Sequence, residues 1–154
     1  MIRYIQPFAS ACKMVFKRFV GADIKAERPY YAGEKEVSGW DLFGIIGFSG
    51  DARGSLVIAM KRELAFKLTA ALTGKIYTEL ESDVLDAVGE LVNIIAGHVK
   101  KGLDGALGLV ISLPITVKGY NHAVTWLTGH TKVICIPFKI FDDDIFMISI
   151  TLEF

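Results

Sequence analysis

Cysteine and histidine are scarce in this sequence, and their scarcity argues against two kinds of site. Cys12 and Cys135 are the only cysteines, and both stand among apolar neighbours. We therefore expect two buried free thiols rather than a disulfide. The three histidines have no metal-ligand spacing to one another or to a cysteine, which argues against a zinc site. The sequence predicts no metal ion and no cofactor of the protein's own.

Net charge and long apolar runs are also missing. Among 154 residues, 17 basic and 17 acidic side chains cancel, so the chain lacks the dense positive charge on which nonspecific nucleic-acid binding rests. The charges of Arg3, Lys13 and Lys17 interrupt the N-terminal apolar residues too often for a signal peptide. No apolar run approaches the ~20 residues of a membrane span. We expect a cytoplasmic protein without nucleic-acid or membrane partners.

Apolar side chains, in contrast, are abundant. They make up 52% of a chain with no net charge, which suits a protein that buries surface against a partner or against a second copy. The apolar β patterns at 109–119 and 130–140 would leave long hydrophobic edges if nothing paired with them. These features predict a homodimer.

Hydrophobic periodicity predicts an α+β fold. Apolar residues recur at helical spacing in three segments, and β patterns occupy much of the rest. The expected helices are 4–20, 61–73 and 83–102, and the expected strands are an edge strand or extended loop at 24–32, a hairpin of 38–48 with 53–60, and runs at 109–119, 130–140 and 145–153. This order favours an α/β sandwich, in which an antiparallel sheet packs against helices, in a single domain spanning 1–154.

Turn and cap residues mark several boundaries. Gly74 is expected to end the middle helix, and Ser82 or Asp83 to cap the long one. The stretch Gly102–Gly108 looks like a phosphate-binding loop, but it follows a helix rather than a strand, so we interpret it as a simple connection. Asp142–Asp144 predicts a tight acidic turn between the last two strands.

The helix expected at 83–102 has two distinct faces. At about 100° per residue, Asp86, Glu90, Asn93 and Gly97 fall within a sector of about 60°, which we call the polar stripe. The apolar residues of the opposite face are the expected core: Val84, Val88, Leu91, Val92, Ile95 and Val99. His98 falls beside this apolar face, so we expect it to pack at the boundary.

A solvated helix surface is the simplest interpretation of the polar stripe, but two features favour a docking face. Asparagine is a poor residue for a helix interior, and Gly89 and Gly97 each cost about 1 kcal/mol relative to alanine. Both glycines flank the pair Glu90 and Asn93 and would leave the backbone accessible. A smooth face with one acid and one amide suits contact with another protein.

The pattern Asp86-x3-Glu90-x2-Asn93, followed by Pro114, resembles the signature of the CheX/CheC/FliY chemotaxis phosphatases. Three further segments are similar to CheX-like domains: Gln6-Pro7-Phe8, Gly44–Gly50 and Arg53-Gly54-Ser55. The resemblance runs over nearly the whole chain and implies a CheC/CheX-like fold.

Two-site members of this family carry the motif in two helices. The matching positions of the first helix are Ser10, Met14 and Lys17, so the second Glu and Asn are missing and one site remains. This is similar to CheX, and the resemblance to single-site members again implies a dimer. Ser10 and Asp86 also stand about 76 residues apart in a weak internal repeat.

The resemblance implies a protein substrate: a CheY-like response-regulator receiver phosphorylated on aspartate, with Mg²⁺ held by the receiver. It implies that Asn93 orients the attacking water. It also implies that Glu90 engages the receiver's active-site lysine. Asp86 and Gly97 are assigned to partner contact. The alternative is a non-catalytic module that binds receivers or belongs to a flagellar or signalling assembly.

Overall fold

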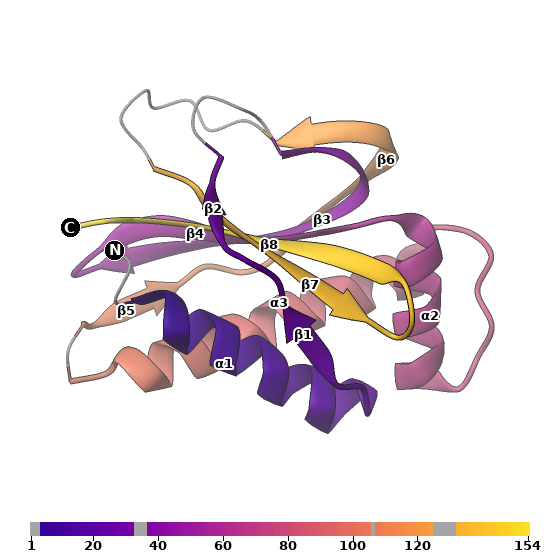
Figure 1. Cartoon of the computed structure of the whole chain (residues 1–154), viewed down its shortest axis with the longest axis horizontal. Coiled ribbons are helices and arrows are strands. Elements are labelled where there is room, and N and C mark those ends of the chain that lie inside the picture. Colours follow the sequence, from indigo (N-terminus) through magenta and orange to yellow (C-terminus); the bar gives the residue numbers. More distant parts are fainter. Residues whose placement is uncertain (1–3, 33–36, 106, 125–131) are drawn as a thin grey trace.

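Helices cover one face of a single antiparallel sheet. The computed structural model describes residues 4–32, 37–105, 107–124 and 132–154 (Figure 1). Its elements are α1 (Ile5–Val15), the π-helical turn η2 (Phe16–Val20), β1 (Ile24–Ala26), β2 (Tyr30–Tyr31), β3 (Val37–Gly50), β4 (Arg53–Met60), α2 (Arg62–Thr73), α3 (Ser82–Leu103), β5 (Leu109–Ile111), β6 (Ile115–Val124), β7 (Ile134–Ile140) and β8 (Asp144–Glu153). The predicted α+β class is confirmed.

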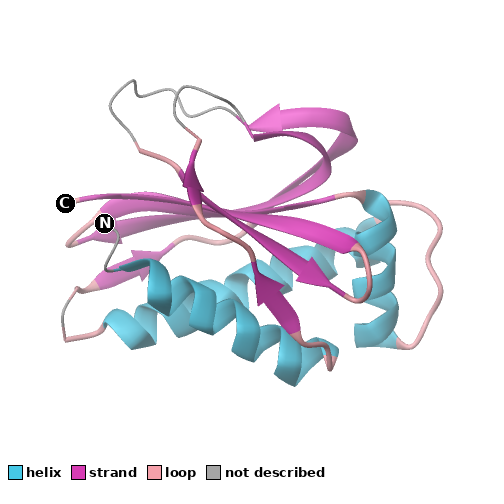
Figure 2. Ribbon diagram, in the orientation of Figure 1, coloured by secondary structure: helices cyan, strands magenta, loops and turns pink. Residues whose placement is uncertain are grey.

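The strand order explains where the helices sit. The sheet runs β1-β7-β8-β4-β3-β5, with β2 also paired to β7 and β6 also paired to β3. All of these pairs are antiparallel. Helices α1 and α3 lie side by side beneath the sheet, and α2 stands at one end of it (Figure 2). The long α3 therefore has one side against the sheet and one side turned outward.

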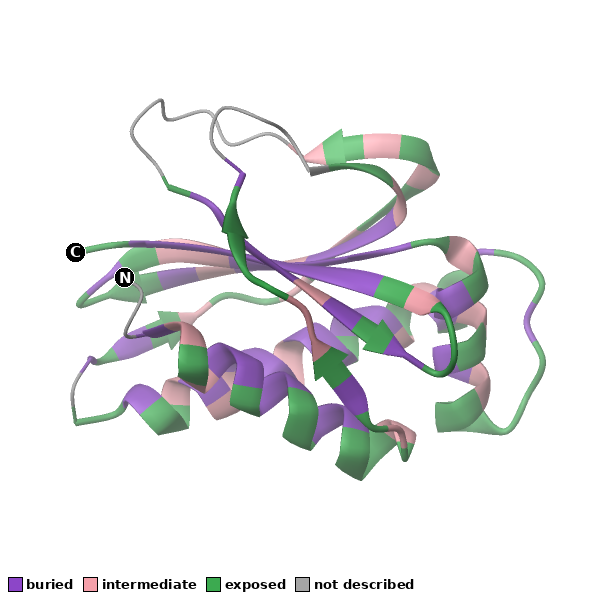
Figure 3. Cartoon of the chain, viewed as in Figure 1, coloured by how far each residue is buried: buried purple, intermediate pink, exposed green. Residues whose placement is uncertain are grey.

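Alternation along the strands divides the apolar side chains between two faces of the sheet. Ile46, Ile58 and Ile148 belong to the large core that includes the buried sides of α1 and α3. Alternate residues of β3, β4, β7 and β8 face the other way, where Phe43, Val57, Ala59, Cys135 and Met147 belong to a smaller cluster. Burial is accordingly concentrated where the helices meet the sheet (Figure 3).

The cap prediction for α3 is wrong. Glu81, not Ser82 or Asp83, is the N-cap residue, and no side chain caps the helix. Tyr77 folds back toward the helix and its hydroxyl donates to Asp83 Oδ2 at 3.1 Å. The Asp83 carboxylate is thus engaged by the preceding loop instead of by the backbone N–H groups. Gly74 ends α2 in the left-handed conformation, with φ 76°, as predicted.

The single β run expected at 109–119 is split into β5 and β6. Ser112 separates them: its N–H donates to Gly47 O at 2.9 Å, and its Oγ accepts from Gly47 N at 2.8 Å. Pro114 follows and has no N–H to donate, so continuous pairing with β3 is interrupted there. The two strands pair with different parts of β3 on either side of this break.

The run expected at 130–140 is paired along both of its sides. Its described part, β7, pairs with β8 on one side and with β1 and β2 on the other. The hydrophobic edge that this run would leave if unpaired is therefore covered by β1 and β2. Residues 130 and 131, with His130, lie outside the described residues.

Several smaller predictions are confirmed. Cys12 and Cys135 are both buried and free, and burial raises the pKa of each thiol. Residues 141–143 form the turn between β7 and β8, where Asp144 accepts a hydrogen bond from Lys67 Nζ at 2.7 Å. As expected, α3 ends at Leu103 and β5 begins at Leu109, so the glycine-containing stretch opens no helix.

In the described ranges, no helix is long and apolar enough to cross a membrane.

Candidate functional site

Helix α3 positions the polar stripe by burying its other side. All six residues predicted as core are at most 1% exposed. On the outward side, Asp86 and Glu90 are exposed, while Asn93 and Gly97 are half-buried. The structure therefore brings the predicted residues of the polar stripe together on one accessible face. His98 is half-buried at the boundary between the apolar and the outward side of α3, as expected.

The polar groups of the stripe are not used inside the molecule. The side chains of Asp86, Glu90 and Asn93 make no hydrogen bond or ion pair with any residue that the structure describes. Glu90 and Asn93 are three residues apart on one helix, so their side chains are neighbours. An acid that can bind a cation and an amide that can orient water are thus presented together to an incoming partner.

The two glycines near the pair differ, and the expectation that both leave the backbone accessible is wrong for Gly89. Gly89 is buried, and a Cβ at this position would lie 3.3 Å from Thr116 Cγ2. It is therefore a close-packing position between α3 and β6. A Cβ at Gly97 would meet nothing within 4 Å, so that part of the stripe is open. Sequence reasoning had no means of finding Thr116, which lies on a strand far along the chain.

Pro114 belongs to the same neighbourhood. It is half-buried and directly precedes β6, two residues before the Thr116 contact with α3. The neighbouring Leu113 is 86% exposed. Because Ser112 is hydrogen-bonded to Gly47 through both its N–H and its Oγ, this short segment is held in place at the sheet. The spacing that linked Pro114 to the polar stripe thus corresponds to proximity across the α3–β6 packing.

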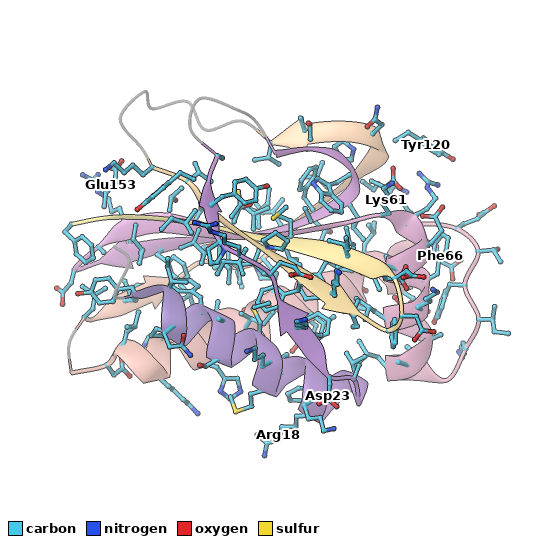
Figure 4. The ribbon with its side chains drawn as sticks, viewed as in Figure 1. Arg18, Asp23, Lys61, Phe66, Tyr120 and Glu153 are labelled. Carbon is cyan, nitrogen blue, oxygen red and sulfur yellow. The ribbon has the colours of Figure 1, made fainter. Side chains whose placement is uncertain are left out.

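The corresponding positions on α1 carry no such pair. Ser10 accepts a hydrogen bond from Gln6 Nε2 at 3.3 Å, and Met14 is 43% exposed. Lys17 Nζ lies 3.2 Å from Asp23 Oδ1. Lys17 is also in the π-helical turn rather than in α1 itself. Figure 4 shows Arg18 and Asp23 at this end of the helix.

A cavity that sequence reasoning missed lies at the N-terminal end of α3. It has a volume of about 680 Å³, and its lining includes Arg62, Leu80, Glu81, Lys118 and Tyr120. Tyr120 projects from β6 near the start of α2 (Figure 4). These residues come from three separate segments, which explains why no local pattern revealed them.

The wall of this cavity is anchored by Asp41. Its carboxylate accepts hydrogen bonds from the backbone N–H of Arg62 at 3.0 Å and of Asn121 at 3.1 Å. Partial burial raises the pKa of Asp41, but these donors and the Arg62 guanidinium outweigh it and hold that pKa below its usual value. Asp41 is therefore ionised at neutral pH, and its bonds to Arg62 stay charge-assisted.

The chemistry available at the polar stripe needs no protein nucleophile. Both thiols are buried, and burial raises their pKa, so neither forms a reactive thiolate at the surface. The described part of the chain also contains no group of three or more His, Cys, Asp or Glu side chains that could hold a metal ion. What the stripe offers is positioning by an exposed carboxylate, that of Glu90, and a half-buried amide, that of Asn93.

Comparisons with known proteins find similar proteins over most of the chain. The family model described as "Chemotaxis phosphatase CheX" matches residues 42–139, well over half of the chain. The Thermotoga maritima protein named CheY-P phosphatase CheX is 26% identical over 137 residues, which cover 87% of this chain and 85% of that protein.

Solved structures share the fold. A CheC-like superfamily protein from Shewanella sp. PV-4 has a TM-score of 0.90 and 27% identity, covering 100% of this chain and 99% of that one. The CheX chain solved in a CheX-CheY-BeF3-Mg²⁺ complex from Borrelia burgdorferi has a TM-score of 0.83 and 24% identity, with 98% of each chain covered. The predicted CheC/CheX-like fold and the predicted phosphatase class are confirmed. The chain belongs to the chemotaxis phosphatase CheX family.

Proposed function

We propose that this chain hydrolyses the phospho-aspartate of a CheY-like receiver domain docked on the polar stripe. The observation that carries this proposal is the pair Glu90 and Asn93, side by side on an outward helix face with no partner among the described residues. The Thermotoga maritima relative is named for activity on phosphorylated CheY, and the Borrelia CheX was solved together with CheY. A response regulator is the substrate that fits both the site and the family.

Asn93 would position the water that attacks phosphorus. Hydrolysis of an acyl phosphate requires water in line with the bond to the aspartate oxygen, which leaves as a carboxylate while phosphate is released. A side-chain amide both donates and accepts hydrogen bonds, so it can fix the orientation of that water. Charge on the phosphoryl group would be balanced by Mg²⁺ on the receiver, the ion present in the Borrelia complex. No cofactor of this chain's own enters the proposal.

Glu90 would fix the position and orientation in which the receiver docks. A carboxylate binds a cationic side chain more strongly than an amide does, and the predicted partner is the lysine of the receiver's active site. One helical turn separates Glu90 from Asp86, which would contact the receiver at the edge of the site. Gly97 would let the receiver approach, because no atom lies within 4 Å of the position that its Cβ would take.

A homodimer in the cytoplasm remains part of the proposal. Among the described strands, β6 pairs with β3 alone, so its outer edge is open to another strand. Ile115 and Val117 on this strand are 62% and 39% exposed. An open edge with apolar side chains favours pairing with a second copy. Light scattering at micromolar concentration measures the mass, and a monomer there would exclude the dimer.

Substitution of Asn93 tests the proposed chemistry. We expect Asn93→Ala to fold normally, because Asn93 faces outward and alanine favours the helix. Phosphate release from saturating acetyl-phosphate-labelled CheY should fall about 10²- to 10³-fold, the usual cost of one transition-state hydrogen bond. Lys17→Ala, at the corresponding position on the other helix, is the control. Wild-type turnover by Asn93→Ala would mean that the polar stripe only binds receivers, as in the non-catalytic alternative.

A further inference from the structure

The polar stripe continues into a seam between α3 and β6. Side chains on one face of β6 meet α3 and the loop before it: Thr116 Cγ2 is 3.3 Å from where a Gly89 Cβ would be, and Lys118 Nζ donates to Leu80 O at 3.2 Å. Gly89 lies one helical turn before Asn93, so it borders the polar stripe. A partner seated on the stripe therefore also faces this seam, which ends at the cavity beside Tyr120.

The far end of the seam is rigid. The Arg62 guanidinium lies 3.7 Å from the centre of the Tyr120 ring, and Arg62 Nη2 donates to Gly119 O at 3.0 Å. Arg62 Nε is also 3.6 Å from Asp41 Oδ2. Tyr120 is nevertheless 80% exposed. An exposed aromatic ring whose back is already held by an arginine loses little conformational entropy on binding, which is typical of interface anchors.

The charge left available at this cavity is negative. Arg62 is paired with Asp41. Lys118 donates to the neutral Leu80 carbonyl and keeps its charge, so it offsets one of the two acids in the lining and one net negative charge is left. Glu79 and Glu81 both line the cavity, are exposed, and have no side-chain partner in the described ranges. The cavity therefore combines free carboxylates with the apolar surfaces of Leu80 and Tyr120. A long basic side chain matches both, since its stem is apolar and its head is cationic.

The cavity also lies within reach of the same partner. Glu81, the N-cap residue of α3, and Glu90 are nine residues apart, which is about 13.5 Å along the helix axis and half a turn around it. The cavity is joined to the polar stripe through β6, where Thr116 lies beside Gly89 and Lys118 reaches Leu80. A standard interface covers about 800 Å² on each partner, equivalent to a disc about 16 Å in radius, so a receiver docked over the Thr116 side of the stripe reaches the cavity.

We propose that the cavity is a socket for a lysine or arginine side chain of the phosphorylated receiver. The aliphatic stem lies between Leu80 and the Tyr120 ring, and the cationic head lies between Glu79 and Glu81. This inference rests on the proposed function, because the occupant is the receiver docked on the polar stripe. The socket contributes affinity and partner selection, while Asn93 contributes the chemistry.

Neutralising the two acids tests the socket. With acetyl-phosphate-labelled CheY, Glu79→Gln/Glu81→Gln should raise KM about 3- to 10-fold with turnover at saturation near that of the wild type. The rise of KM with salt should also become shallower, since two interface charges are gone. Asp142→Asn/Asp143→Asn is the matched control, because it makes the same change in net charge in an exposed turn. Equal KM values for the two double variants would overturn the socket.

A second variant tests the aromatic wall. Tyr120→Ala should weaken binding of beryllofluoride-loaded CheY about 10-fold by calorimetry, whereas Tyr31→Ala, an exposed tyrosine on β2, should leave it unchanged. Unaltered binding by Tyr120→Ala overturns the socket, and so does a drop in mass by light scattering, which would assign Tyr120 to the dimer. Binding is measured without hydrolysis, so the socket is judged separately from catalysis. If the wild-type protein binds CheY through Tyr120 but releases no phosphate, the proposed activity is refuted and the socket is not.

Discussion

Helices α1 and α3 lie side by side on the same face of the sheet, and each buries one side in the same core. Phe8, Cys12 and Val15 do this for α1, as Val88 and Val99 do for α3. Their outward positions differ: at matching spacing α1 carries Ser10, Met14 and Lys17, and α3 carries Asp86, Glu90 and Asn93.

The comparison separates what the fold needs from what the site needs. The buried sides of both helices are apolar because the core between helix and sheet requires it. The outward side of α1 is free to vary, since Met14 and Lys17 do not enter the core. The outward side of α3 has an acid and an amide with no partner among the described residues, and the proposed chemistry depends on this difference. Substituting the outward acid and amide of α3 should therefore lower activity, whereas substituting the matching side chains of α1 should have little effect on activity.

After that of Asn93→Ala, the largest effect is expected at Glu90. Glu90→Ala should lower kcat/KM toward phosphorylated CheY about 10- to 100-fold, because a charge pair across the interface is lost. KM should rise as well as kcat fall, which distinguishes this variant from Asn93→Ala. Met14→Ala, at the matching position of α1, should stay within about twofold of the wild type. A comparable loss in both variants would show that the receiver docks across the two helices.

A smaller effect should distinguish Gly89 from Gly97, two of the three glycines in α3. Replacing a helical glycine by alanine stabilises a helix by about 1 kcal/mol where there is room for the methyl group. Gly97→Ala should show that gain in urea unfolding, because its Cβ meets nothing within 4 Å. Gly89→Ala should gain less or lose stability, because Thr116 must move by a few tenths of an ångström. Equal gains would mean that the α3–β6 packing is looser than the 3.3 Å separation indicates.

The sequence was sufficient for features that depend on local periodicity. The three helices, the β3–β4 hairpin and the polar stripe all follow from residue spacing within one segment, and the structure confirms them. The division of α3 into one buried side and one outward side follows directly from the 3.6-residue repeat of the helix. These features needed no knowledge of what packs against them.

Features that depend on distant contacts could not be predicted. Asp83 looked like a cap, but Tyr77 takes its carboxylate. The run 109–119 looked continuous, but Ser112 bonds to Gly47 and breaks it. Gly89 looked open, but Thr116 lies against it. In each case the decisive neighbour comes from another element, or from outside the local pattern, so the residue type alone was compatible with both outcomes.

The smallest effect is expected from moving the proposed catalytic pair, Glu90 and Asn93, to α1. Met14→Glu/Lys17→Asn reproduces the spacing of Glu90 and Asn93, but the π-helical turn begins at Phe16, between the two positions. A π-helical turn has a wider residue period than an α-helix, so the new asparagine should not stand above the new glutamate as Asn93 does above Glu90. Built into Asn93→Ala, the double change should therefore restore phosphate release by less than about twofold. Substantial recovery would instead show that residue identity and spacing suffice, and that the only difference between the two helices is which side chains they carry.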